Sequence, residues 1–391
     1  MKRASKRVIT RLIQPLLGGI SARNTSHASI TRGGNTLWPF DDAPEKVLLV
    51  RFDVLGDTVM SLALAADLKE LFPDISVSFA TTPESATIAR LCPYIDEIIE
   101  ADAPAITHIQ TGWRPDKWLA FGEVITKIRN QHFDIAISLY GPLSGTITGF
   151  SGAKWRIGYG SEASTGHFDV ALAGKRSDGI KHEIEWVRGL SMTDNIDLAN
   201  NLVKIPEGES LWAESVMPEC STEIIALHPG ARTGDAKRWP TKFWRQLAER
   251  LDRAHFHLIT VGGPADIQIG ENILRGLSKQ HNQLAGSTSI PQLAAILDKV
   301  DLFVSGDSGP LHLASSLGTP VVGIYGPTDP TLSGPYGRTS EVVRANIPCS
   351  PCYNLQEPAS CAYGDQLCMQ WIEPHLVMEA VHSILKQLVQ E

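Results

Sequence analysis

One stretch of the sequence combines a carboxylate, hydroxyls, glycines and a histidine at the end of an apolar run. From position 305 it reads SGDSGPLHLASSLGTP, and its candidate binding residues are Asp307, Ser308, Gly309 and His312. The glycine and the proline that follows it allow a tight turn into a helix, whose first turn presents unpaired N–H groups and a positive dipole end. This pattern predicts an anion site. Simple helix capping by Asp307 and Ser308 is the alternative.

A second stretch, HPGARTGDAKRWP at 228–240, also follows an apolar run directly. It offers backbone N–H groups, the cations of Arg232 and Lys237 and the hydroxyl of Thr233, which together suit a diphosphate. A loop made basic only for solubility is the other interpretation. The sequence has neither GxxxxGK[ST] nor GxGxxG, so a P-loop NTPase and an NAD-binding Rossmann enzyme both lack their main signature.

A third stretch, VLLVRFDVLGDTVMSLAL at 47–64, places Asp57 where an apolar run changes into a helical pattern. A carboxylate there serves either as the N-cap of the helix or as a general base that takes a proton from a reacting hydroxyl. Arg51, Asp53 and Arg156 are further charged candidates. They either steer a phosphorylated acceptor or lie on the rim of a site.

Short apolar runs alternate with helical patterns, which predicts parallel sheets covered by helices on both faces. The expected strands fall into two blocks, at 46–52, 75–81, 95–101 and 133–140 and at 224–230, 256–263, 301–307 and 320–327. Residues 191–222 between them are polar and predict a linker. Because ligands of such sheets bind at the carboxyl ends of the strands, the three stretches above are expected at binding edges.

Composition supports two domains and argues against nucleic acid as a partner. The chain has 391 residues, 43% of them hydrophobic, a formal charge of −8 and a pI near 5.9. A nucleic-acid-binding protein usually carries a basic face. Residues 1–40 differ from the rest, since they hold seven Lys and Arg and no Asp or Glu. This basic extension is a disordered arm, a contact with an anionic membrane face, or an organellar transit peptide.

These stretches together resemble glycosyltransferase family 9, the heptosyltransferases that add heptose from ADP-heptose to the lipopolysaccharide inner core. The resemblance covers about residues 46–385 and rests on RFDVLGDTVMSLAL, KWRIGYG, HEIEWVRGL, HPGARTGDAKRWP, GGPAD, GDSGPLHLASSLGTPVVGIYGPT and the cysteine-bearing tail. It implies the GT-B fold, an α/β architecture of two doubly wound Rossmann-like domains facing across a cleft. The implied division is an extension at 1–42, an acceptor domain at 43–205 and a nucleotide-sugar domain at 206–391.

The resemblance also implies roles for individual residues in an inverting, metal-independent transfer without a cofactor. Asp57 matches the family's general base, and Lys237 and Thr233 match residues that hold the donor's phosphates. The donor pocket has Ser308 where the family more often has threonine. The implied donor-binding residues are Arg232, Thr233, Asp266, Asp307, Ser308, Gly309 and His312, with Asp266 at the ribose, and the implied acceptor-binding residues are Arg51 and Arg156.

Six cysteines form two groups. Cys92 and Cys220 are isolated, and we expect both to be buried. The tail cysteines are Cys349, Cys352, Cys361 and Cys368, with the spacing C-x2-C-x8-C-x6-C. Their number and first spacing suit a structural zinc or a redox cluster, although the second pair lacks a knuckle spacing. After them, PHLVMEAVHSILKQLV predicts an amphipathic helix, which in GT-B proteins often packs back on the N-terminal domain.

The sequence therefore predicts a cytoplasmic glycosyltransferase, peripheral on the inner membrane face, that moves heptose from ADP-heptose to a lipopolysaccharide core acceptor. Three alternatives stay open. The first is a family 9 transferase with another donor or acceptor sugar, and the second is a GT-B sugar-nucleotide epimerase. The third is a non-catalytic nucleotide-sugar-binding protein.

Overall fold

The computed structural model describes residues 43–102, 115–162, 166–179, 181–192, 202–231, 235–278, 281–337, 339–353, 361 and 363–390. The predicted basic extension at 1–42 lies outside these residues. The chain divides into two compact units, each built around one six-stranded sheet. We refer to described residues 43–192 as the first half and to 202–390 as the second half. The domain boundary predicted at 205 and 206 stays a prediction.

The first half is a parallel sheet in the order β3-β2-β1-β4-β5-β6. Its strands are β1 (Lys46–Val50), β2 (Ser76–Thr81), β3 (Glu97–Glu100), β4 (Ile135–Ser138), β5 (Trp155–Tyr159) and β6 (Val170–Leu172). Its helices are α2 (Leu55–Leu71), α3 (Pro83–Ala89), α5 (Pro115–Arg129), α6 (Gly141–Phe150) and α7 (Glu183–Arg188).

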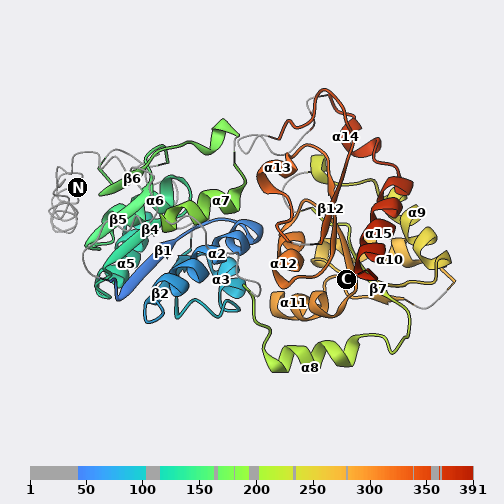
Figure 1. Cartoon of the computed structure of the whole chain (residues 1–391), viewed down its shortest axis with the longest axis horizontal. Coiled ribbons are helices and arrows are strands. Elements are labelled where there is room, and N and C mark those ends of the chain that lie inside the picture. Colours follow the sequence, from blue (N-terminus) through green and yellow to red (C-terminus); the bar gives the residue numbers. More distant parts are fainter. Residues whose placement is uncertain are drawn as a thin grey trace. The chain divides into compact units, whose positions relative to one another are not determined.

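The central strand β1 is buried on both faces, as its unbroken apolar run predicts. Val47 and Leu49 pack with residues of α2, α3 and α7, whereas Leu48 and Val50 pack with residues of α5 and α6. Successive side chains of a strand point to opposite faces, so the two sets belong to two separate cores. Figure 1 shows the two groups of helices on either side of this sheet.

The second half repeats the arrangement, with the strand order β12-β11-β10-β7-β8-β9. Its strands are β7 (Ile224–His228), β8 (His257–Thr260), β9 (Asn282–Gln283), β10 (Leu302–Gly306), β11 (Val321–Tyr325) and β12 (Ser340–Arg344). Its helices are α8 (Glu207–Val216), α9 (Thr241–Arg253), α10 (Ile267–Leu274), α11 (Ile290–Lys299), α12 (Gly309–Leu317), α13 (Pro330–Ser333), α14 (Leu367–Gln370) and α15 (Pro374–Leu388).

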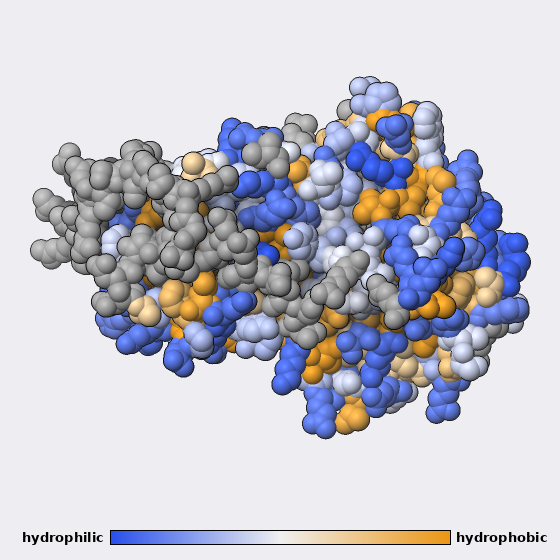
Figure 2. All heavy atoms as spheres, viewed as in Figure 1, coloured by the Kyte–Doolittle hydropathy of each residue, from blue (hydrophilic) through white to orange (hydrophobic). Residues whose placement is uncertain are grey.

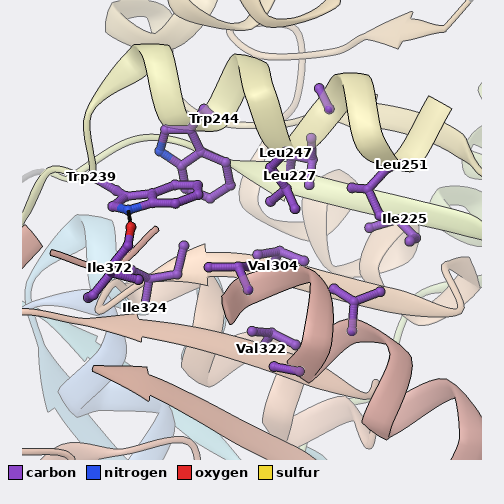
Figure 3. Close-up of a cluster of buried hydrophobic side chains, with 14 of the residues drawn as sticks. Ile225, Leu227, Trp239, Trp244, Leu247, Leu251, Val304, Val322, Ile324 and Ile372 are labelled. Atoms are coloured by element: carbon purple, nitrogen blue, oxygen red, sulfur yellow. Dashed lines mark hydrogen bonds between the residues drawn. The ribbon is translucent and has the colours of Figure 1, made fainter. Parts of the chain in front are cut away.

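One apolar core joins α9, the second sheet and α15. Figure 3 shows Trp239 and Trp244 beside α9, with strand side chains below them. The two indole rings meet edge to face at 5.0 Å between centroids, and Trp239 donates its Nε1–H to the Ile372 carbonyl at 2.8 Å. The terminal helix α15 packs on α9, β11 and β12. Its apolar face therefore covers the sheet of its own half, and the packing on the N-terminal domain expected from the resemblance stays a prediction.

The predicted α/β class with two doubly wound halves is confirmed, and all eight predicted strands are present. Four further strands escaped the sequence pattern, namely β5, β6, β9 and β12. Of these, β6, β9 and β12 lie at sheet edges, where burial is partial and the apolar run that marks a central strand is not needed. The prediction of a linker at 191–222 was also incomplete, because residues 207–216 form the helix α8, which packs on α11.

The surface carries both hydrophilic and apolar side chains. Figure 2 shows a mostly hydrophilic face on the second half with several apolar patches. Exposed apolar side chains are common on folded proteins, so we assign these patches no role. No helix within the described residues is long and apolar enough to cross a bilayer.

Candidate active site

The point where the strand order reverses in the second sheet lies between β7 and β10. These strands pair in parallel, with Ser305 aligned with His228 at their carboxyl ends. Ligands of doubly wound sheets bind at this point, because the connections from the two neighbouring strands leave to opposite faces. The polar stretches at 228–240 and 305–320 both start here, so the topology brings together what the sequence separates.

Lys237 and Asp307 form a partly buried ion pair at this edge. The Lys237 ammonium lies 2.7 Å from Asp307 Oδ2, and the two side chains are 11% and 9% exposed. His312, from the first turns of α12, places its Nε2 3.9 Å from Asp307 Oδ1. Burial alone would raise the pKa of Asp307, but the neighbouring His312 and the charge of Lys237 lower it to about 2. Asp307 is therefore ionised at neutral pH and holds Lys237 in place.

Ser308 occupies the N-cap position of α12, yet its side chain makes no capping hydrogen bond. Its Oγ lies 2.9 Å from Ser305 Oγ and 3.3 Å from His228 Nδ1. The alternative role of Ser308 as a simple side-chain cap is therefore wrong for this structure. Its hydroxyl lies beside the amino end of a nine-residue helix, where an anion would be stabilised by the dipole.

His228 lies behind this hydroxyl and is almost fully buried. Burial lowers its pKa to about 4, against the opposing effect of the Asp266 carboxylate, so the imidazole is neutral at pH 7. Ser305 donates its hydroxyl proton to the Gly306 carbonyl at 2.9 Å, and in the tautomer that carries a proton on Nδ1, His228 donates to Ser305 Oγ at 3.0 Å. Because the Ser305 proton is then engaged, Ser308 is the donor in the 2.9 Å contact between the two hydroxyls.

Asp266 is folded against the backbone at this edge. Its Oδ2 accepts the Gly263 N–H at 2.9 Å, and a Cβ atom at either Gly230 or Gly262 would lie 2.6 Å from that oxygen. The glycines of HPG and GGPAD thus make room for this carboxylate. Gly262 additionally has a φ of +149°, which disfavours other residues. In this structure the Asp266 side chain is 9% exposed. Its predicted contact with a ribose stays a prediction.

In the first half, Asp57 is the third residue of α2 and not its N-cap, which is Val54. Its negative charge in the first turn suits the helix dipole. The side chain is partly exposed. The alternative role of an N-cap is therefore wrong, while the general-base role stays a prediction.

The two arginines predicted to bind the acceptor are buried and paired. Arg51 donates to Ser61 Oγ at 3.1 Å and lies 3.4 Å from Asp53. Arg156 makes two 2.8 Å hydrogen bonds to Asp169 and a third, at 3.2 Å, to the Gly149 carbonyl. The alternative that they lie on an exposed rim is wrong, since they are 1% and 8% exposed. Their predicted role in acceptor binding stays a prediction.

The remaining predictions concern the loop after β7 and the cysteines. Arg232 and Thr233 lie outside the described residues. Cys92 is buried as expected, but Cys220 is exposed. In the part of the chain that the structure describes, no group of three or more His, Cys, Asp or Glu side chains is placed to hold a metal ion. The four tail cysteines therefore form no such group there.

The sequence missed two residues of this edge. His228 ends the strand before HPGARTGDAKRWP, and a histidine that ends a central strand just before a Pro-Gly pair is a recognisable signal. Tyr353 lies in the tail, and its ring centroid is 4.1 Å from the Lys237 ammonium. Nothing in the local pattern around Tyr353 indicated that it returns to the sheet edge.

Comparisons with known proteins agree with the architecture. Residues 121–362 match the model of glycosyltransferase family 9 (heptosyltransferase). Lipopolysaccharide heptosyltransferase 2 of Salmonella typhimurium is 25% identical over 359 residues, which are 88% of this chain and 99% of that relative.

Two solved structures show the same fold. The ADP-heptose LPS heptosyltransferase II of Escherichia coli has a TM-score of 0.69 at 22% identity, over 88% of this chain and 99% of that chain. A family 9 glycosyl transferase of Veillonella parvula has a TM-score of 0.72 at 18% identity, over 88% and 97%. These likenesses confirm the predicted GT-B fold class.

Proposed function

Because the chain belongs to glycosyltransferase family 9, we propose that it transfers a heptose from ADP-heptose to a lipopolysaccharide core acceptor. The relative from Salmonella typhimurium is named a lipopolysaccharide heptosyltransferase, and the E. coli structure is named an ADP-heptose LPS heptosyltransferase. Each is matched over nearly its full length. The observation that carries the proposal is the cluster of Lys237, Asp307 and Ser308 at the amino end of α12. A cation, a hydroxyl and a helix dipole are the groups that stabilise a departing diphosphate.

The proposed chemistry is an inverting displacement at the anomeric carbon. Asp57 accepts the proton of the acceptor hydroxyl while that oxygen forms its bond to the sugar. The bond between the anomeric carbon and the diphosphate oxygen breaks, and ADP leaves with the bonding electron pair. Lys237, Ser308 and the N–H of Gly309 stabilise the charge that develops on the diphosphate, assisted by Arg232 and Thr233, which precede Lys237 in the stretch HPGARTGDAKRWP.

The remaining donor residues have supporting roles in this proposal. His312 faces Asp307 and reaches a phosphate oxygen, while Asp266 binds the ribose after its carboxylate turns from Gly263. We propose that no metal takes part, since Lys237 and the helix dipole supply the positive charge that a metal would otherwise provide. Residues 1–40, with seven cations, would bind the anionic cytoplasmic face of the membrane that carries the acceptor.

Transfer by the purified full chain tests this function. We expect product from ADP-heptose and a core acceptor that lacks the added heptose, detected by mass spectrometry, with less product from UDP- and GDP-linked sugars. Turnover should persist after treatment with EDTA. Transfer only from another nucleotide sugar would make the donor wrong, whereas donor binding without transfer to any core acceptor would favour a binding protein.

A further inference from the structure

The first residues of the cysteine-bearing tail are fixed to the turn that follows β11. The N–H groups of Cys352 and Tyr353 both donate to the Pro327 carbonyl, at 2.8 and 2.9 Å. Ser350 donates its hydroxyl to the Gly326 carbonyl at 2.6 Å. Three hydrogen bonds to two adjacent carbonyls hold the backbone of 350–353 at the carboxyl end of the second sheet, so the tail reaches the candidate active site.

Tyr353 uses this anchorage to place its ring against Lys237. The ammonium lies 4.1 Å from the ring centroid and 2.7 Å from Asp307 Oδ2. A cation is attracted to an aromatic face at up to about 6 Å, so the distance of 4.1 Å to the ring is a close cation–π contact. The distance of 2.7 Å to Asp307 is that of a hydrogen-bonded ion pair. The lysine stem is only 11% exposed. Lys237 is therefore held from two directions, by the carboxylate that directly follows β10 and by a ring from the tail.

This double contact matters because lysine carries its charge on a flexible four-carbon stem. An ammonium has three N–H donors. The Asp307 carboxylate takes one, and the ring face covers another side. The third is then directed by the first two contacts, and a diphosphate oxygen would meet a donor that is already oriented. Asp307 alone would leave the ammonium able to swing about the carboxylate.

We propose that Tyr353 is a positioning residue for Lys237, which makes the start of the cysteine-bearing tail part of the donor site. The inference rests on the proposed function in one respect, the assignment of Lys237 to the donor's diphosphate. Tyr353 acts through its aromatic face, not through its hydroxyl. Phenylalanine should therefore replace it, whereas an aliphatic side chain of similar size should not.

The first test measures ADP binding by calorimetry in the full-length wild type and in variants at this position. We expect Tyr353→Phe to bind within about twofold of wild type and Tyr353→Leu to bind about fivefold to thirtyfold more weakly, the size of a partly desolvated cation–π contact. Tyr363→Leu is the matched control, because that tyrosine lies in the same tail and is 73% exposed. Equal binding by Tyr353→Leu and wild type would overturn the proposal. If the leucine variant does not fold, Tyr353→Gln takes its place.

A double-mutant cycle separates positioning from direct contact with the ligand. In the Lys237→Met background, Tyr353→Leu should weaken ADP binding no further, because the group that the ring positions is already absent. An undiminished additional loss would show that Tyr353 contacts the nucleotide itself, and the positioning role would then be wrong.

A third measurement does not depend on which donor the protein uses. Limited acetylation followed by peptide mapping should label Lys237 severalfold faster in Tyr353→Leu than in wild type or Tyr353→Phe, because the ring shields the ammonium. If wild type binds neither ADP nor ADP-heptose, the proposed donor is wrong and the labelling alone decides. An unchanged labelling rate in Tyr353→Leu would overturn the role of Tyr353 whatever the donor.

Discussion

The carboxyl ends of the two sheets each hold a partly buried cation, in different surroundings. At the first sheet, Arg176 lies over the rings of Tyr140, Tyr159 and Trp186 at 5.0, 5.4 and 5.8 Å, pairs with Glu162 and donates to the Leu139 carbonyl at 2.7 Å. At the second sheet, Lys237 has one carboxylate and one ring.

The difference shows how one topology is adapted to two tasks. An arginine surrounded by rings, a carboxylate and a carbonyl has most of its donors engaged by the protein, which suits a structural role. A lysine beside hydroxyls and a helix amino end keeps donor capacity for an anion. We therefore expect changes at the second sheet to affect donor binding, and changes at Asp57 to affect the chemical step alone.

Replacement of Asp57 should have the largest effect. Asp57→Asn removes the proposed base while keeping the side-chain shape, so kcat should fall by about 100-fold to 10,000-fold. The dissociation constant for ADP should stay near its wild-type value. Steady-state transfer assays with calorimetry check both. Glu70→Gln, at the other end of α2, is the control; a kcat for Asp57→Asn equal to that of the control would exclude the base role.

Replacement of Lys237 should follow in size and should affect both steps. Lys237→Met removes the charge that faces the leaving diphosphate, so kcat should fall by about 100-fold to 1,000-fold and ADP binding should weaken. Lys242→Met, an exposed cation on α9, is the matched control and should retain wild-type kinetics. If Lys237→Met lowered kcat but left the ADP affinity unchanged, the expectation that changes at the second sheet affect donor binding would be wrong.

The buried His228 should make stability depend on pH. Its pKa falls from 6.5 to about 4 in the folded chain, so the unfolded chain binds the proton first as the pH decreases. The free energy of unfolding keeps its full contribution from neutral His228 above pH 6.5. As the pH falls to about 4, this contribution is lost, by up to about 3 kcal/mol at about 1.4 kcal/mol per pKa unit.

Urea unfolding at pH 7 and pH 4.5 measures this loss. His228→Asn should reduce the difference in unfolding free energy between the two pH values. His132→Asn, on an exposed side chain of the first half, should leave that difference as in wild type. The same difference in His228→Asn as in wild type would contradict the burial of a neutral imidazole.

The smallest effect concerns the two tryptophans of the second core. Trp239 donates to the Ile372 carbonyl, whereas the buried Nε1 of Trp244 has no hydrogen-bond partner among the described residues. Trp239→Phe should therefore lower the free energy of unfolding by about 1 kcal/mol more than Trp244→Phe does. Urea unfolding of both variants measures the difference. A greater loss for Trp244→Phe would mean that packing outweighs the hydrogen bond.

The two sheets and half of the candidate site can be predicted from local patterns in the sequence. Buried parallel strands need unbroken apolar runs, and runs such as 47–50 and 302–304 are visible without a structure. Lys237, Asp307 and Ser308 were also predicted, because residues that follow such runs stand at a sheet edge. Edge strands such as β12 were not, since half-burial leaves no apolar run.

How these residues are held in place depends on contacts that form only in the folded chain. The pairing of β7 with β10 puts His228 beside Ser305 and Ser308, and the hydrogen bonds to Pro327 return the tail so that Tyr353 meets Lys237. The folded chain also places the Asp266 carboxylate against Gly230 and Gly262. Contacts between residues far apart in the chain depend on strand order and loop path, and neither leaves a local pattern in the sequence.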